Sequence, residues 1–99
     1  MKGKARKVQS HVVESEPEHQ PVYTMAITVR MVEMPAYTIR WLEDHELVRP
    51  ARTEGNQRLF CDEDIELLKE IADLLEEGVN LAGIRAIFRL KHQMEGEQE

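Results

Sequence analysis

Residues 25–60 read MAITVRMVEMPAYTIRWLEDHELVRPARTEGNQRLF, and Pro35 divides two short stretches that have helical periodicity. In the first stretch Met25, Val29 and Val32 follow one another at spacings of four and three, the pattern of one face of a helix. The sequence therefore predicts a short helix from Met25 to Val32 that ends before the proline.

The second stretch begins at Pro35, because a proline cannot continue a helix but suits the first turn of the next one. We expect this helix to run from Pro35 to about His45 and to bury Ile39, with Ala36 and Leu42 as further candidates for the core. Two short helices interrupted by Glu33-Met34-Pro35 form a helix-turn-helix motif.

Two short extended runs follow this motif and flank a loop of turn-forming residues. The runs are residues 47–50 and 58–60, and the loop between them, residues 51–57, contains Glu54-Gly55-Asn56. Glycine and asparagine at the tip of such a loop are typical of a turn. The pattern predicts a hairpin with a longer loop, in other words a wing.

Two longer helices are expected after the wing. Apolar residues at spacings of three and four indicate the third helix, namely Ile65, Leu68, Ile71, Ala72 and Leu75. Gly78 is expected to end this helix, and Asn80 to cap a fourth one. The apolar residues of the fourth helix are Leu81, Ile84, Ile87 and Phe88. The predicted fold is mainly α, a winged helix-turn-helix with two short helices, a β-hairpin wing and two packing helices.

The ends of the chain differ in composition from this folded part. Residues 1–21 are polar and lack apolar periodicity, so we expect a disordered N-terminal arm. Residues 93–99 are expected to form a disordered acidic tail. The winged helix-turn-helix domain is therefore assigned to residues 22–92.

Length and composition exclude several classes of function. A chain of 99 residues allows one small domain, which leaves little room for a deep catalytic pocket. The single cysteine and the scattered histidines lack the spacing of a metal site. No nucleophile–base pair or phosphate loop is visible, so we expect neither an enzyme nor a cofactor.

No apolar run is long enough to span a membrane, and no secretory signal is visible. We therefore expect a cytoplasmic, nucleoid-associated protein.

The formal net charge of −6 is unevenly distributed along the chain. Residues 23–60 contain five arginines and five carboxylates, whereas residues 61–99 contain four basic and eleven acidic residues. Because DNA affinity depends on local neutralisation of phosphates, an arginine-bearing face can bind DNA even in an acidic protein. Its dependence on salt is expected to be shallow.

The outward face of the second helix is the first candidate for DNA contact. Its residues, at spacings of three and four, are Tyr37, Arg40, Trp41 and Asp44, with Thr38 beside them. Arginine, threonine and aromatic side chains can bind phosphates and base edges in a major groove. In the alternative interpretation Trp41 packs beneath the wing, and Arg40 pairs with Glu43 or Asp44.

The wing is the second candidate. Arg52 and Arg58 flank its tip, a placement that allows the two arginines to straddle a phosphate backbone. The alternative is a solvated hairpin whose arginines serve solubility. The order of helix, tight turn, polar-aromatic helix and arginine-bearing wing favours DNA binding.

Five stretches of the sequence carry a family resemblance. They are Tyr23-Thr24-Met25, Thr38-Ile39-Arg40-Trp41-Leu42-Glu43, Leu47-Val48-Arg49-Pro50-Ala51-Arg52, Gly55-Asn56-Gln57-Arg58-Leu59-Phe60 and Gly78-Val79-Asn80-Leu81-Ala82-Gly83-Ile84. Over about residues 23–90 the chain resembles the MerR family of bacterial regulators. Within that family it is most similar to the heat-shock repressor branch, and next to the nitrogen-metabolism repressor branch.

The resemblance implies a winged helix-turn-helix dimer that binds a palindromic promoter site in double-stranded DNA, and we expect it to act as a repressor. By motif position, DNA contacts are implied for Thr38, Arg40 and Trp41 of the helix and for Arg52, Asn56 and Arg58 of the wing. We expect a weak dimer that pairs on DNA, and control by a regulatory protein partner.

Two other functions fit the same sequence. One is an architectural or recombination-accessory DNA-binding protein without promoter regulation. The other is a protein-interaction module that docks through its acidic third helix. Binding at clustered repeats without promoter preference favours the first, and salt-independent binding to a protein without DNA affinity favours the second.

Overall fold

The computed structural model describes residues 19–97, with side chains up to residue 95. The expected N-terminal arm therefore lies outside the described residues except for residues 19–21. The chain divides into two compact units, residues 1–69 and 70–99, and the boundary falls within the third helix.

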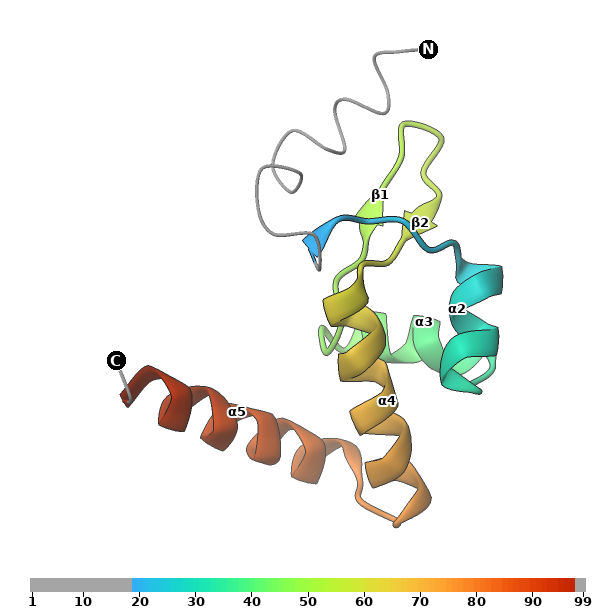
Figure 1. The fold of residues 1–99 in the computed structure, drawn as a ribbon. Helices are drawn as coiled ribbons and strands as arrows, with labels where there is room; N and C mark the ends of the chain where they lie inside the picture. The colour runs from blue at the N-terminus through green and yellow to red at the C-terminus, as the bar shows by residue number, and fades with distance from the viewer. Residues whose placement is uncertain (1–18, 98–99) are drawn as a thin grey trace. The chain divides into compact units, whose positions relative to one another are not determined.

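The described part contains four α-helices and one two-stranded antiparallel hairpin. In chain order these elements are α2 (Met25–Val32), α3 (Ala36–Asp44), β1 (Ala51–Arg52), β2 (Arg58–Leu59), α4 (Asp62–Glu76) and α5 (Leu81–Glu97) (Figure 1). The mainly α, winged helix-turn-helix architecture expected from the sequence is confirmed.

The first unit has an apolar core to which both short helices and the wing contribute. Its core residues, all at most 5% exposed, are Val32, Met34, Ile39, Leu42, Val48, Phe60, Ile65 and Leu68. In α3 the expected Ile39 and Leu42 are fully buried, whereas Ala36 is only half-buried. In α2 the buried residues are Thr28 and Val32, which lie one turn apart.

The turn between α2 and α3 contains a residue in a left-handed conformation. Glu33 ends α2 with φ 57° and ψ 48°, and its N–H donates to the carbonyl oxygen of Val29. Glycine adopts this conformation without steric cost, whereas a residue with a Cβ loses roughly 1–2 kcal/mol there. The tight turn of the motif is therefore made with a strained residue.

Replacing Glu33 with glycine is expected to stabilise the protein. The strain that is relieved exceeds the entropy that glycine adds to the unfolded chain, so the free energy of unfolding rises by about 0.5–1 kcal/mol. Urea denaturation measures this change. Glu66→Gly, at an exposed position within α4, is the matched control and should cost about 1 kcal/mol. A loss of similar size in Glu33→Gly contradicts the explanation.

The first strand of the wing lies further along the chain than the sequence predicted. Residues 47–50 were expected to be extended, but the pairing joins Ala51 to Leu59 and Arg52 to Arg58. The N–H of Leu47 instead donates to the carbonyl oxygen of Leu42 at 3.0 Å and so closes the end of α3. Because Pro50 has no N–H to give to a partner strand, pairing begins after it.

The segment before α2 is tied to the wing and to the start of α4. The N–H groups of Val22 and Tyr23 donate to the carbonyl oxygen of Phe60, and the N–H of Phe60 donates to the carbonyl oxygen of Tyr23 at 2.7 Å. The Tyr23 hydroxyl donates to Asp62 at 2.6 Å, and this hydrogen bond raises the pKa of Tyr23. Nε2 of His19 lies 2.9 Å from Oε1 of Glu63, so contacts with the rest of the domain begin within the segment assigned to the arm.

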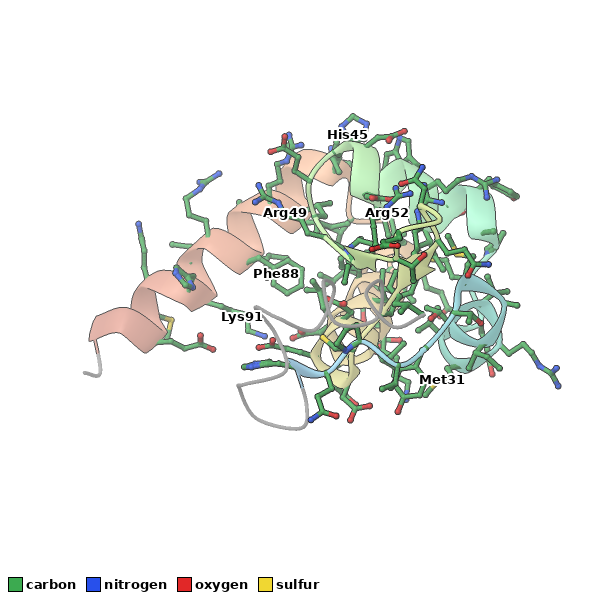
Figure 2. All side chains as sticks on the ribbon, turned by 90° about the horizontal axis from the view of Figure 1, so that it is seen from above. Met31, His45, Arg49, Arg52, Phe88 and Lys91 are labelled. Atoms are coloured by element: carbon green, nitrogen blue, oxygen red, sulfur yellow. The ribbon has the colours of Figure 1, made fainter. Side chains whose placement is uncertain are left out.

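In the second unit, a left-handed glycine and an asparagine cap join the end of α4 to α5, as predicted. Gly78 has φ 88°, and Asn80 accepts a hydrogen bond from the N–H of Gly83 at 2.9 Å through its side chain. Ile84 is fully buried. Lys91 pairs with Glu70 and lies 5.5 Å from the ring centre of Phe88, and Figure 2 shows both side chains on one side of α5.

The last helix is longer than expected. Residues 93–99 were expected to form a disordered tail, but α5 continues to Glu97. No proline interrupts this segment, and its methionine, glutamine and glutamate residues favour helix. Among residues 19–97 no helix is both long and apolar enough to cross a membrane.

Candidate nucleic-acid interface

The outward face of α3 is exposed, as its spacing predicted. Tyr37 is 69% exposed and Trp41 39%. Arg40 and Asp44 are also exposed, while Thr38 is half-buried. The opposite face of the same helix provides the buried residues of the core, so α3 is anchored on one side and open on the other.

The structure does not show the pairing of Arg40 with Glu43 or Asp44 that the alternative interpretation of this face required. Arg40 makes no ion pair or side-chain hydrogen bond with any other residue in 19–97, neither with Glu43 nor with Asp44. The ring of Trp41 meets that of His45, one turn later, edge to face at a centroid distance of 5.2 Å. Figure 2 shows His45 at the end of α3. An arginine and two aromatic side chains are thus left available on one surface.

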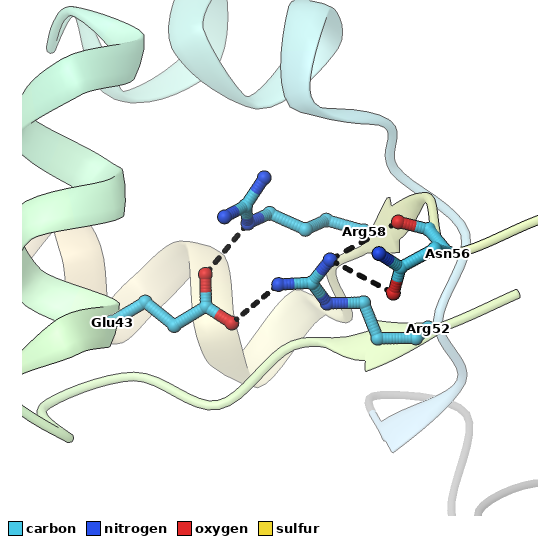
Figure 3. A network of polar contacts seen from close by, with 4 residues as sticks. All are labelled: Glu43, Arg52, Asn56 and Arg58. Carbon is cyan, nitrogen blue, oxygen red and sulfur yellow. Dashed lines mark hydrogen bonds and ion pairs between the residues drawn. The ribbon is translucent and has the colours of Figure 1, made fainter.

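The two wing arginines are held by a carboxylate of α3. Oε1 of Glu43 accepts a hydrogen bond from Nε of Arg58 at 2.6 Å, and Oε2 accepts one from NH2 of Arg52 at 3.0 Å (Figure 3). The Glu43 side chain is only 19% exposed, and those of Arg58 and Arg52 are 24% and 35% exposed. One carboxylate therefore links the helix to both strands of the wing.

The same arrangement reaches the tip of the wing through Asn56. NH1 of Arg52 donates to the backbone oxygen of Asn56 at 3.0 Å and to its side-chain oxygen at 3.3 Å. Asn56 has φ 68°, a conformation that asparagine tolerates better than most residues. The N–H of Thr53 donates to Gln57, and that of Asn56 donates to Thr53. The tip is thus a hydrogen-bonded turn.

Glu43 is the residue of this site that sequence reasoning missed. It was considered only as a partner of Arg40, and nothing in the local spacing pointed to residues nine and fifteen positions further along. Burial raises the pKa of Glu43, but the hydrogen bonds from Arg58 and Arg52 outweigh it, so the pKa lies below its ordinary value. Glu43 is therefore ionised at neutral pH.

Other features near the wing are more loosely held. Arg49 pairs with Glu46 at 3.5 Å, and both side chains are more than 70% exposed. Such a surface pair contributes little to stability.

Cys61 precedes α4, and burial raises the pKa of its thiol. Among residues 19–97 no cluster of three or more histidine, cysteine, aspartate or glutamate side chains could hold a metal ion.

Comparison with known proteins places this arrangement in a family. The profile of the MerR HTH family of regulatory proteins matches residues 23–91. The HTH-type transcriptional regulator GlnR of Bacillus anthracis is 42% identical over 71 residues, covering 72% of this chain and 55% of GlnR. The putative heat shock protein HspR of Streptomyces coelicolor is 37% identical over 78 residues, covering 78% of this chain and 52% of HspR.

A solved structure is also similar. It is the crystal structure of HiNmlR, a MerR family regulator lacking the sensor domain, bound to promoter DNA. The TM-score is 0.65 at 27% sequence identity, and the match covers 70% of this chain and 53% of that one. The chain belongs to the MerR family of helix-turn-helix regulatory proteins, a class of regulators rather than enzymes. It spans about half the length of these relatives.

Both branches named from the sequence are represented among the relatives. The motifs resemble the heat-shock repressor branch most, whereas the sequence identity is 42% with GlnR and 37% with HspR. The family assignment does not depend on this order, because the matched region of 23–91 contains all the elements from α2 to the middle of α5.

Proposed function

We propose that the protein is a sequence-specific transcription regulator, a repressor, that reads a palindromic promoter site in double-stranded DNA. The observation that carries this proposal is the exposed face of α3, on which Arg40 has no partner among the described residues and lies beside Tyr37 and Trp41. An arginine on a helix that enters the major groove can form two hydrogen bonds to a guanine. A buried opposite face makes such a helix rigid enough to do so.

The contacts divide between the helix and the wing. Tyr37, Thr38, Arg40 and Trp41 face the groove, while Arg52, Asn56 and Arg58 lie along the phosphate backbone. Contacts to phosphates position a protein, and contacts to base edges specify the sequence. The similarity to HiNmlR, which was solved bound to promoter DNA, supports this mode of binding.

A palindromic site requires two copies of the protein, because a dimer matches its own symmetry to the spacing of two half-sites. On α5, Leu90 and Met94 lie one turn apart and are 57% and 60% exposed. This apolar patch supports a weak dimer that pairs on DNA, where the duplex holds both copies at high effective concentration.

The proposed repressor role rests on the resemblance to the heat-shock repressor branch. We further propose a regulatory protein partner and a location in the cytoplasm, at the nucleoid.

Enrichment of duplexes from a random-sequence library tests the proposed function. We expect the protein to enrich one motif composed of two inverted half-sites, because each copy places one α3 in the groove. Sedimentation of the protein with the enriched duplex should give two copies per duplex. Retention of all duplexes without a motif would favour the architectural function, and no retention at low salt would contradict DNA binding.

A further inference from the structure

We propose that Glu43 is a positioning residue of the DNA-reading surface, whose carboxylate holds both wing arginines against α3. Helix and wing then meet the duplex as one rigid surface with a fixed spacing between groove and backbone contacts. This inference rests on the proposed function and names the residue that sets its geometry.

The geometry of the contact supports this role. Each oxygen of Glu43 accepts from a different arginine, at 2.6 and 3.0 Å, and the two arginines come from opposite strands of the hairpin. A hairpin of two residue pairs has few backbone hydrogen bonds of its own to fix its orientation. All three side chains are at most 35% exposed, so this pair of bridges is less weakened by solvent than an exposed one.

The two arginines are engaged to different extents. A guanidinium has five N–H donors, and Arg52 makes three hydrogen bonds, one to Glu43 and two to Asn56. Arg58 uses only its Nε–H, on Glu43. The terminal nitrogens of Arg58 make no hydrogen bond within residues 19–97, and that pair can bind a phosphate in two-point fashion.

The different engagement of the two arginines distinguishes two roles for Glu43, positioning the arginines for DNA or competing with DNA phosphates for them. If Glu43 merely occupied the arginines in place of phosphate, DNA binding would require the bridges to break. Because Arg58 meets Glu43 through Nε alone, its terminal nitrogens can bind a phosphate while the bridge persists. Arg52 fixes the tip of the wing, and Arg58 presents donors from it.

The test compares Glu43→Gln with Glu54→Gln, a control that makes the same chemical change on the wing. Glu54 is exposed and makes no ion pair within residues 19–97. For each variant, affinity is measured for the duplex enriched by the wild-type protein and for a random-sequence duplex of equal length. Hydrogen exchange of the Thr53 and Asn56 amides in the free protein reports the order of the wing, and circular dichroism confirms folding.

We expect Glu43→Gln to lower the ratio of the two affinities roughly tenfold, the loss of about one positioned base contact, and to speed exchange in the wing. Glu54→Gln should change neither. Glu43→Asp keeps the charge but is too short to reach both arginines, so it should lower the ratio as well.

Three results would overturn the proposal in different ways. Tighter binding of Glu43→Gln to both duplexes at an unchanged ratio would make Glu43 a competitor of phosphate. If Glu43→Gln changes neither the ratio of the two affinities nor the hydrogen exchange of the wing amides, Glu43 does not position the wing. If the wild-type protein enriches no duplex, the proposed function itself fails, and the role of Glu43 with it.

Discussion

Replacing Arg40 with alanine is expected to abolish most of the protein's preference for its enriched duplex over a random one. The side chain projects from the exposed face of α3 without a partner among residues 19–97, so its donors are available to a base. A bidentate contact from arginine to guanine contributes roughly 1–3 kcal/mol of discrimination, and each 1.4 kcal/mol is about tenfold in affinity. Competition binding with the two labelled duplexes measures the change.

Arg30→Ala is the control for the loss of charge. Arg30 is exposed on α2 and lies outside the proposed contacts, so its removal should weaken binding to both duplexes equally and only slightly. If Arg40→Ala shows the same uniform weakening, then α3 does not read bases through this residue.

Truncating Phe60 to alanine should have the largest effect on stability. The ring is fully buried and is the largest side chain in the core, and its residue joins the wing to Tyr23 through backbone hydrogen bonds. Phenylalanine-to-alanine changes in a core cost about 3–5 kcal/mol, a large share of the roughly 5–15 kcal/mol that a small domain possesses. Thermal unfolding followed by circular dichroism is expected to show a much lower midpoint or no transition.

Tyr37→Ala removes an aromatic ring of similar size from the surface. Because Tyr37 is 69% exposed, its truncation should change stability by at most about 0.5 kcal/mol. Equal losses of stability in Phe60→Ala and Tyr37→Ala would show that burial does not explain the contribution of Phe60 to stability.

The helices could be predicted from the sequence because their signals are local. The apolar spacing of α2 and α3 and the capping residues Gly78 and Asn80 each act within a few positions of the chain, and the structure shows all of them. The exposed face of α3 followed from the same periodicity. Helix positions, helix caps and exposed helix faces depend on residues within a few positions of one another, so the sequence was sufficient to predict them.

The features that were mispredicted depend on contacts between distant residues or on competition between neighbours. The first strand was placed at residues 47–50, although the N–H of Leu47 closes α3 and pairing begins at Ala51. The bridges from Glu43 to Arg52 and Arg58 span nine and fifteen residues, a distance over which spacing carries no signal. The sequence placed Arg52 and Arg58 on either side of the tip of the wing, but it did not reveal their contact with the helix beside them.

The most direct test of the account uses Trp41, the only tryptophan in the sequence. It lies on the proposed reading face and is 39% exposed, so acrylamide should quench its fluorescence readily in the free protein. The account predicts that the enriched duplex protects Trp41 from acrylamide in a saturable manner, and that a random duplex at the same concentration protects it far less. Binding of the enriched duplex, shown by the anisotropy of a DNA label, with unchanged quenching of Trp41 would contradict the claim that α3 reads the DNA.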